Sequence, residues 1–480
     1  MINLIKNELK KIFSKKSIYI LAIITFAFII LNNVLYKFVI EGDLLDIDGM
    51  IYTGMSEEEL TKLDLGNTEE FSVYVDIKTN KEIYELKQKY PKNSWQERVI
   101  DEKAHTVLYE LNSLKYKPTL SETEQAMLNK AEEQYSSLMN DLNNSDWKTI
   151  VNKEITSIDL KIANLELQSD NMAKQEIKML ENQKETLQMR LDKDIPYGTD
   201  YLNIAIDGYV DCVRIIDELK NKEMTYQEKI SYNNALELKA KSEYILNTKL
   251  DIQNNTNSRS VLANVFSEYG LFIIILVIII AGTIVSEEFN KGTIKLLLIK
   301  PYSRIKILAA KYITVVIIIL LTLIFTAIVQ VLIGGIIFGF GNLSIPVVEY
   351  NFNTNTLMEF NIFAYVGIKA LILLPHFLLI GLIAFTLSTI FTNSALAITM
   401  TLLTYMTSGI VLTITSLYKK AEFLKYWLTM NWNLDEYLFG RLSQLEFLNF
   451  RFSAIMCAIY FIALLAISLI VFKKKNIKNI

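Results

Sequence analysis

Cysteine and histidine are almost absent from this chain of 480 residues, which has two of each. Cys212 and Cys457 are too few for the disulfide framework of a small secreted domain. His105 and His376 are too few for a zinc site. The G-x-x-x-x-G-K-[ST] loop that cradles nucleotide phosphates is missing, and no carboxylate pair or nucleophile with its base is visible. We therefore expect a non-catalytic chain with no cofactor, no metal and no nucleic-acid partner.

Apolar residues make up 51% of the chain and gather in long runs. A helix needs about 20 residues to cross a hydrocarbon core of roughly 30 Å. Six runs are long enough, which predicts an all-α integral membrane protein with six transmembrane helices. The third run is longer than a span needs, so we expect it to tilt or break near Gly334 and Gly335. The predicted spans are 18–40, 268–285, 312–340, 360–390, 395–417 and 453–472.

Lysine and arginine near the spans predict the orientation, because basic loops stay on the cytoplasmic side. They gather before the first span, between the second and third spans, and after the sixth. Six crossings then leave both termini in the cytoplasm, and we expect a multi-pass protein of a bacterial plasma membrane. Residues 41–266 and the loops at 342–359 and 419–449 would lie outside.

The segment 41–266 differs from the rest of the chain in charge. It holds 27 Lys or Arg and 42 Asp or Glu, a net charge of −15, whereas the remainder carries +12. Because the acids alternate with lysines, solubility alone explains them, although weak attraction of cationic solutes stays open. Glycine, proline and period-two alternation are scarce, which predicts a large α-helical extracellular domain.

Helical periodicity in this domain is clearest at 148–194, where apolar residues recur at spacings of three and four. An interruption at 169–171 predicts an antiparallel, coiled-coil-like hairpin with its tip near Asp170. Such apolar stripes are core more often than ligand sites, and a substrate site there is the alternative.

Two further helices are predicted in the same domain. Ser121 and Glu124 form a capping-box pattern at the start of a helix toward residue 141. Another helix should run from about residue 202 into the membrane at 268.

The first residues form an amphipathic pattern. Ile2, Ile5, Leu9, Ile12 and Phe13 share one helical face, and lysines lie on the others. This predicts a helix in the inner membrane interface, with lysines facing anionic headgroups. A cleaved signal peptide is disfavoured because the following apolar run is too long and lacks a small-residue cleavage site.

A charged segment, 286–311, separates the second and third spans. Glu287 and Glu288 open it, six basic residues follow, and Gly292 and Pro301 supply turn signals. Since the chain has little cytoplasmic mass to cover its apolar residues, we expect them to be exposed for a partner.

The order of this segment, acidic, then Gly-Thr, Leu-Leu, Pro-x-Ser-Arg and Lys, resembles the cytoplasmic coupling segment of type-2 ABC transporter permeases, the membrane subunits of ABC exporters. The N-terminal elbow and the six spans fit that family, and the long insert after the first span departs from its commoner members. The resemblance implies a permease that dimerises with itself or a related permease. It would dock on separate ATP-binding subunits, which hold ATP and Mg²⁺, and export a peptide, an antimicrobial, a lipid or another amphipathic substrate.

The resemblance also implies roles for single residues. Phe289, Ile294 and Leu297 would make the buried contact with the ATPase, Gly292 would permit close backbone approach, and Pro301 would end the short helix. The turn at 391–394 would make a minor contact. The implied ATPase-coupling residues are Glu287, Glu288, Phe289, Gly292, Thr293, Ile294, Leu297, Pro301, Ser303 and Arg304.

Polar residues inside the predicted spans are the second group of candidates. His376 falls at mid-membrane directly after a proline, where it is functional by default unless it bonds a carbonyl that the proline frees. Thr401, Thr404 and Ser408 share roughly one face of the fifth span and could line a pathway. Hydroxyls in membrane helices more often bond their own backbone or pack on a neighbouring helix.

The expected domains are 1–40 with the elbow and first span, 41–266 with the helical stalk, and 267–480 with five spans and the segment 286–311. Two other functions stay open. A membrane-anchored helical scaffold for secretion or cell-envelope assembly explains the stalk and spans but gives no reason for the segment 286–311. A mechanotransmission permease would share the stalk but should lack the last two spans.

Overall fold

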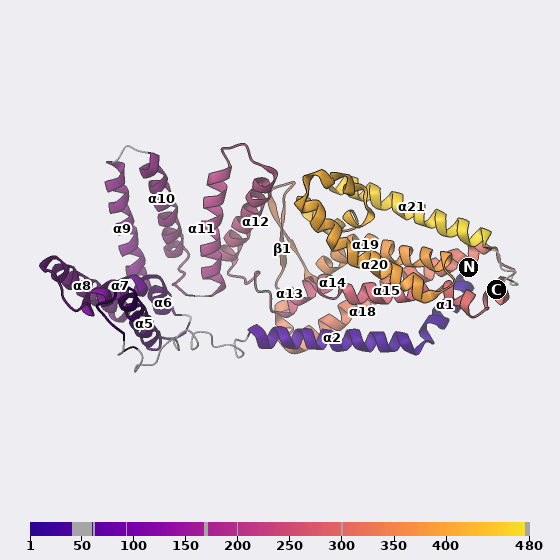
Figure 1. Ribbon diagram of the computed structural model, residues 1–480, viewed down its shortest axis with the longest axis horizontal. Helices are drawn as coiled ribbons and strands as arrows, with labels where there is room; N and C mark the ends of the chain where they lie inside the picture. Colours follow the sequence, from indigo (N-terminus) through magenta and orange to yellow (C-terminus); the bar gives the residue numbers. More distant parts are fainter. Residues whose placement is uncertain are drawn as a thin grey trace. The chain divides into compact units, whose positions relative to one another are not determined.

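The computed structural model of the chain describes residues 1–40, 60, 63–92, 94–167, 171–198, 200–298 and 301–475. The chain divides into two compact units, the first formed by Met1–Glu41 with Asn254–Ile480 and the second by Gly42–Gln253 (Figure 1). Residues 254–266, which we assigned to the stalk, therefore belong with the membrane helices.

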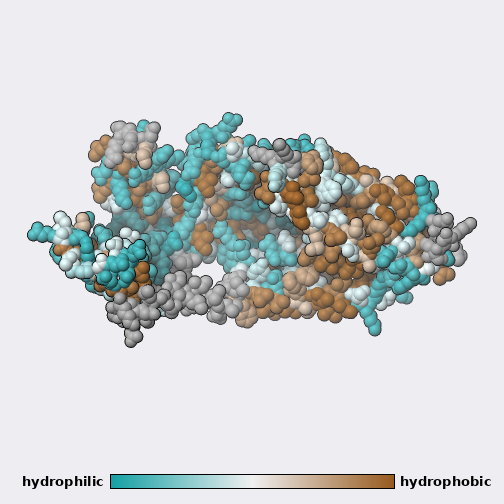
Figure 2. All heavy atoms as spheres, in the orientation of Figure 1, coloured by the Kyte–Doolittle hydropathy of each residue, from teal (hydrophilic) through white to brown (hydrophobic). Residues whose placement is uncertain are grey.

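Six helices of the first unit are long and apolar enough to cross a membrane, which confirms the six predicted spans. α15 and α19 lie at the centre, with 61% and 56% of their most apolar window buried, against 11% for α20. Figure 2 shows hydrophobic side chains over this helical bundle. The helices are α2 (Lys16–Ile40), α15 (Gly270–Thr283) continued by α16 (Ser286–Asn290), α18 (Arg304–Phe338), α19 (Ile362–Ile390), α20 (Ser394–Leu417) and α21 (Phe450–Lys474).

Two details of the predicted spans differ in the structure. No break occurs at Gly334 and Gly335, because α18 is continuous to Phe338, and Gly339 follows with a φ of +83° that favours glycine. The fourth span starts at Ile362 because Phe360 is the last residue of a β-strand.

The two ends of the bundle are closed by different elements. At the elbow end, α1 (Ile2–Phe13) packs against the bundle through Leu4, Glu8 and Ile12, whereas Ile2 of the apolar face stays 80% exposed. At the hairpin end, β1 (Val347–Asn351) pairs antiparallel with β2 (Thr356–Phe360), a feature that sequence analysis missed. The remaining short elements are α13 (Ser258–Ala263), α14 (Val265–Glu268), α17 (Ile294–Leu298), η2 (Gly341–Ser344), η3 (Lys419–Tyr426), η4 (Leu428–Met430) and η5 (Leu434–Gly440).

A cluster of neutral polar side chains lies inside the bundle, toward the hairpin end. Asn33 of α2 and Gln330 of α18 exchange two amide hydrogen bonds of 3.0 and 2.9 Å, and Asn33 also donates to the Tyr269 hydroxyl at 3.1 Å. Both amides are almost fully buried. These three residues, the amide cluster, join α2 to α18 and to the start of α15.

The described residues of the second unit fold mainly as helices, as its periodicity predicts. α9 and α10 run antiparallel, with ion pairs between Lys184 and Asp159 at 2.5 Å and between Lys148 and Asp194 at 2.7 Å. The predicted tip near Asp170 lies outside the described residues. The described helices are α5 (Thr68–Lys87), α6 (Trp95–Val99), the π-helix η1 (Ile100–Ala104), α7 (His105–Lys115), α8 (Glu122–Asn144), α9 (Trp147–Glu166), α10 (Asn171–Asp192), α11 (Tyr201–Leu219) and α12 (Tyr226–Thr248).

The capping box of Ser121 and Glu124 is confirmed at the start of α8. The single helix expected from residue 202 to 268 is wrong. α11 and α12 pair with each other, and α12 ends where Lys249 adopts a left-handed conformation with φ +55°.

Candidate functional site

The segment 286–311 folds as α16, α17 and the first turns of α18. Gly292 turns the chain between α16 and α17 at φ +66°, a left-handed conformation that glycine adopts without a Cβ clash. The Ser303 hydroxyl caps α18 by accepting the N–H of Lys306 at 3.3 Å. Pro301 is exposed between α17 and α18.

Glu288 is the centre of a buried charged network. Its carboxylate, in a residue 4% exposed, accepts hydrogen bonds from Lys11, from the Thr293 hydroxyl and from Lys311 at 3.2 Å. Lys311, 1% exposed, also donates to Glu8 at 2.9 Å and to the carbonyl just beyond α15 at 2.9 Å. Buried charges are tolerated when they are paired. We use the name elbow cluster for Glu8, Lys11, Glu288, Thr293 and Lys311. The charges of its two acids and two lysines balance.

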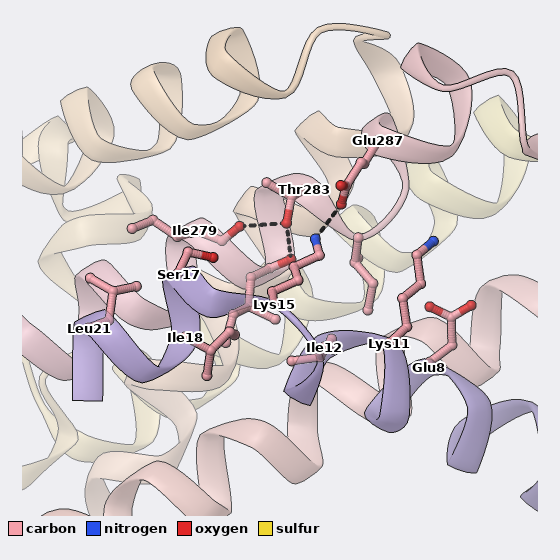
Figure 3. A pocket seen from close by; sticks show the side chains of 12 residues that line it. Glu8, Lys11, Ile12, Lys15, Ser17, Ile18, Leu21, Ile279, Thr283 and Glu287 are labelled. Carbon is pink, nitrogen blue, oxygen red and sulfur yellow. Dashed lines mark hydrogen bonds and ion pairs between the residues drawn. The ribbon is translucent and has the colours of Figure 1, made fainter. Parts of the chain in front are cut away.

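Glu287 makes a second connection to the N-terminal segment. It pairs with Lys15, from the link between α1 and α2, and with Lys291 at 2.6 Å. That hydrogen bond raises the pKa of Lys291 above its ordinary value. Figure 3 shows the side chain of Lys15 directed at Glu287 beside a small cavity of about 60 Å³. Glu8 and Lys11 also line this cavity.

Serine hydroxyls fix the start of α16 to two other spans. Ser388 of α19 accepts the N–H groups of Ser286 at 2.9 Å and Val285 at 3.2 Å. The Ser286 hydroxyl donates to that of Ser394 at 2.8 Å. The turn at 391–394 thus contacts α16 within this chain.

The end of the last span closes over the same segment. Phe289 of α16 packs edge-on against Phe472, and Lys475 lies 4.3 Å from the Phe289 ring centre. Lys475 donates to the last carbonyls of α19 at 2.8 and 3.0 Å, and burial lowers its pKa. Arg304 donates to the carbonyls of Lys473 and Lys475 at 3.0 and 3.2 Å.

Two expectations about the apolar residues of this segment are wrong. Phe289 and Ile294 are 3% and 0% exposed and belong to the core of the bundle, because α21 and the other spans cover them. They do not offer a surface to a partner. The side chain of Leu297 lies outside the described residues, and α17 instead presents Leu296, which is 69% exposed.

The structure gives Gly292 a conformational reason of its own, beside the approach to a partner that the resemblance implies. Among the described residues, no atom lies within 4 Å of the position that a Cβ would take there. The turn conformation, rather than close approach within this chain, therefore requires glycine.

The candidate residues inside the spans lie on α19 and α20 and make contacts within this chain. His376 is 8% exposed and packs against Trp432, with 4.9 Å between ring centres. Thr401, Thr404 and Ser408 donate to carbonyls of their own helix at 2.8, 2.9 and 2.6 Å, which confirms the backbone alternative.

Sequence reasoning missed the roles of Glu8, Lys11 and Lys15. We expected the N-terminal lysines to face headgroups, yet Lys11 and Lys15 pair with the two acids that open the segment 286–311. The available signal was Glu8 itself, the one acid on a helix otherwise rich in lysine.

Comparison with known proteins gives a family match over the C-terminal half of the chain. A family described as protein of unknown function DUF2705 matches residues 224–478, just over half of the chain. The chain belongs to this family. Two observations indicate a multi-pass membrane protein: the six apolar helices of the chain, and a relative that is named a membrane protein.

Two relatives come from Bacillus subtilis (strain 168). The chain is 36% identical over 202 residues to the uncharacterized protein YhcI, which is 42% of this chain and 64% of that protein. It is 37% identical over 123 residues to the uncharacterized membrane protein YdbK, which is 26% of this chain and 45% of that protein. The matched regions span less than two thirds of the length of each relative. No solved structure matches.

Proposed function

We propose that this chain is the permease subunit of an ATP-driven ABC exporter and that α16 and α17 couple it to separate ATP-binding subunits. ATP and Mg²⁺ would be held by those subunits, and the chain itself would be non-catalytic. The permease would work as a dimer with a second copy or a related permease. Its substrate would be a peptide, a lipid or another amphipathic molecule.

The observation that carries the proposal is the convergence of the bundle on one short segment. Glu288 meets α1 through Lys11 and α18 through Lys311, Ser286 meets α19 and α20, and Phe289 meets α21. A force applied to α16 and α17 would therefore reach five other helices through direct contacts. The same segment carries the sequence pattern that resembles permease coupling segments.

The distribution of charged residues supports one orientation of the chain in the membrane. The elbow end presents exposed lysines from α1, α17 and α21, which favours the cytoplasmic side. Both termini would then be cytoplasmic in a bacterial plasma membrane, and the acidic second unit would be an extracellular helical domain. A role for that domain in substrate capture stays open.

The test begins with co-purification. The tagged chain, co-expressed with the proteins encoded beside it, should retain an ATP-binding subunit, and ATP hydrolysis in reconstituted membranes should depend on both. Leu296→Asp places a charge on the exposed apolar residue of α17 and should reduce ATPase retention at least tenfold, because a charge desolvated at a contact is costly. Leu167→Asp, at a residue 84% exposed in the second unit, is the matched control and should retain the ATPase.

Full retention of the ATPase by Leu296→Asp would move the docking surface away from α17. A chain that purifies with no ATP-binding protein at all would favour the scaffold function.

A further inference from the structure

The first span is joined to the rest of the bundle by a polar contact near each of its two ends. At the elbow end, Lys15 just before α2 pairs with Glu287, and toward the hairpin end Asn33 of α2 pairs with Gln330. Between these contacts, an apolar groove of about 400 Å³ separates α2 from α15 and α18. This volume is within the range of small-molecule sites, about 300–1,000 Å³.

The lining of the groove offers nothing to water. Its buried floor includes Ile273 and Ile318, and its open rim includes Tyr19 and Phe325. Three threonines also line it, but each hydroxyl donates to a carbonyl of its own helix: Thr25, Thr322 and Thr326. A water molecule needs two to four polar partners, so an apolar chain fills such a space better. In a membrane, the available apolar chain is the acyl chain of a lipid.

Lysines lie close in the sequence to the residues that line the elbow end of the groove. Phe13 and Ile18 line its elbow end, and Lys16 lies between them in the sequence. Lys6, Lys10 and Lys16 are exposed and make no ion pair within the described part of the chain, whereas Lys11 and Lys15 are occupied by glutamates. Basic residues at a membrane surface attract anionic lipid headgroups.

We propose that this groove binds an anionic phospholipid, with one acyl chain between α2, α15 and α18 and its headgroup phosphate at Lys16. The lipid chain would fill the groove beside α2, between its two polar contacts. This site stands independently of the transport function proposed above.

Native mass spectrometry of the full chain tests the site. Detergent-purified protein is mixed with phosphatidylglycerol or phosphatidylcholine that carry identical acyl chains. The wild type should keep one phosphatidylglycerol more tightly than phosphatidylcholine. Thr322→Phe fills the groove from α18 and should remove that adduct. Thr407→Phe is the matched control, because this threonine also bonds its own helix but lies exposed on α20, and it should keep the adduct.

The headgroup contact is tested separately. Lys16→Gln should lower the preference for phosphatidylglycerol about fivefold, the scale of one basic residue at a membrane surface. Lys474→Gln, an exposed lysine at the end of α21, should leave it unchanged. Ala22→Leu narrows the groove from the α2 side and should weaken the adduct if Thr322→Phe does not yield folded protein.

Equal retention of both lipids by the wild type would overturn the anionic selection. Unchanged adducts in folded Thr322→Phe and Ala22→Leu proteins would place the lipid elsewhere and overturn the groove as its site.

Discussion

The elbow cluster and the amide cluster hold the N-terminal part of the chain to the same helix, α18, with different chemistry. At the elbow end, Lys311 is joined to Glu8 and Glu288 by ion pairs. Toward the hairpin end, Asn33 and Gln330 use neutral amides. A charge that loses its partner costs far more at membrane depth than an amide does. In the elbow cluster each charge has a partner, and Lys11 still reaches solvent with 40% of its side chain exposed.

This comparison predicts that substitutions in the elbow cluster cause the largest loss of folding stability. Lys311→Met leaves Glu8 and Glu288 without this buried partner, which should lower the free energy of unfolding by about 3–5 kcal/mol. Unfolding of the purified protein in lipid–detergent micelles measures this. Lys306→Met, at an exposed lysine on the same helix, should change it by less than about 0.5 kcal/mol. A similar loss in both variants would show that the buried pairs are not the cause.

A smaller loss is expected at the amide cluster. Gln330→Leu leaves the Asn33 amide without its reciprocal partner and should cost about 1–3 kcal/mol in the same assay. The double variant Asn33→Leu with Gln330→Leu removes both polar groups and should recover part of that loss. Additive losses in the double-mutant cycle would contradict direct pairing.

The turn beside the elbow cluster tests whether its geometry depends on glycine. Gly292→Ala places a Cβ on a residue at φ +66° and should cost about 1–2 kcal/mol. Gly409→Ala, in the middle of α20 with open space around its Cβ position, should be neutral or stabilising. If the two substitutions behave alike, backbone strain at residue 292 is not the reason for glycine.

The smallest effect is expected where carboxylates are exposed, in the second unit. Hydrogen bonds from Lys117 and from Ser121 lower the pKa of Glu124 from 4.5 to about 2, and those from Lys222 and Thr225 lower that of Glu228 to about 2. Because the folded pKa is depressed, the contribution to stability is present above about pH 4.5 and is lost as pH falls toward 2.

Circular dichroism of the full chain across this range measures the loss of helix. A Glu124→Gln, Glu228→Gln variant should show a shallower decline between pH 4.5 and 2 than the wild type. Identical titrations would exclude these caps as the cause.

Much of the architecture could be predicted because the sequence pattern of a single helix is local. The six spans follow from runs of apolar residues, and the start of α8 follows from Ser121 and Glu124. The hairpin β1–β2 was missed because its two strands have only five residues each, too few for a clear period-two pattern.

The candidate site was predictable only in part, since its contacts are not local. The acids of 286–311 were visible, but Glu8 and Lys11 became partners only when α1 packed on the bundle. Ile294 was expected to be exposed because the sequence does not reveal which spans would cover it.

The bond between Lys11 and Glu288 joins positions 277 residues apart in the sequence. During synthesis, α1 is therefore made long before Glu288 and must wait while the whole second unit and the second span are made. Arg304 waits in turn for the carbonyl of Lys473, which is made 169 residues later. The elbow end is therefore completed only after the sixth span is made, so a chain stalled in membrane insertion would carry unpaired glutamates and lysines there.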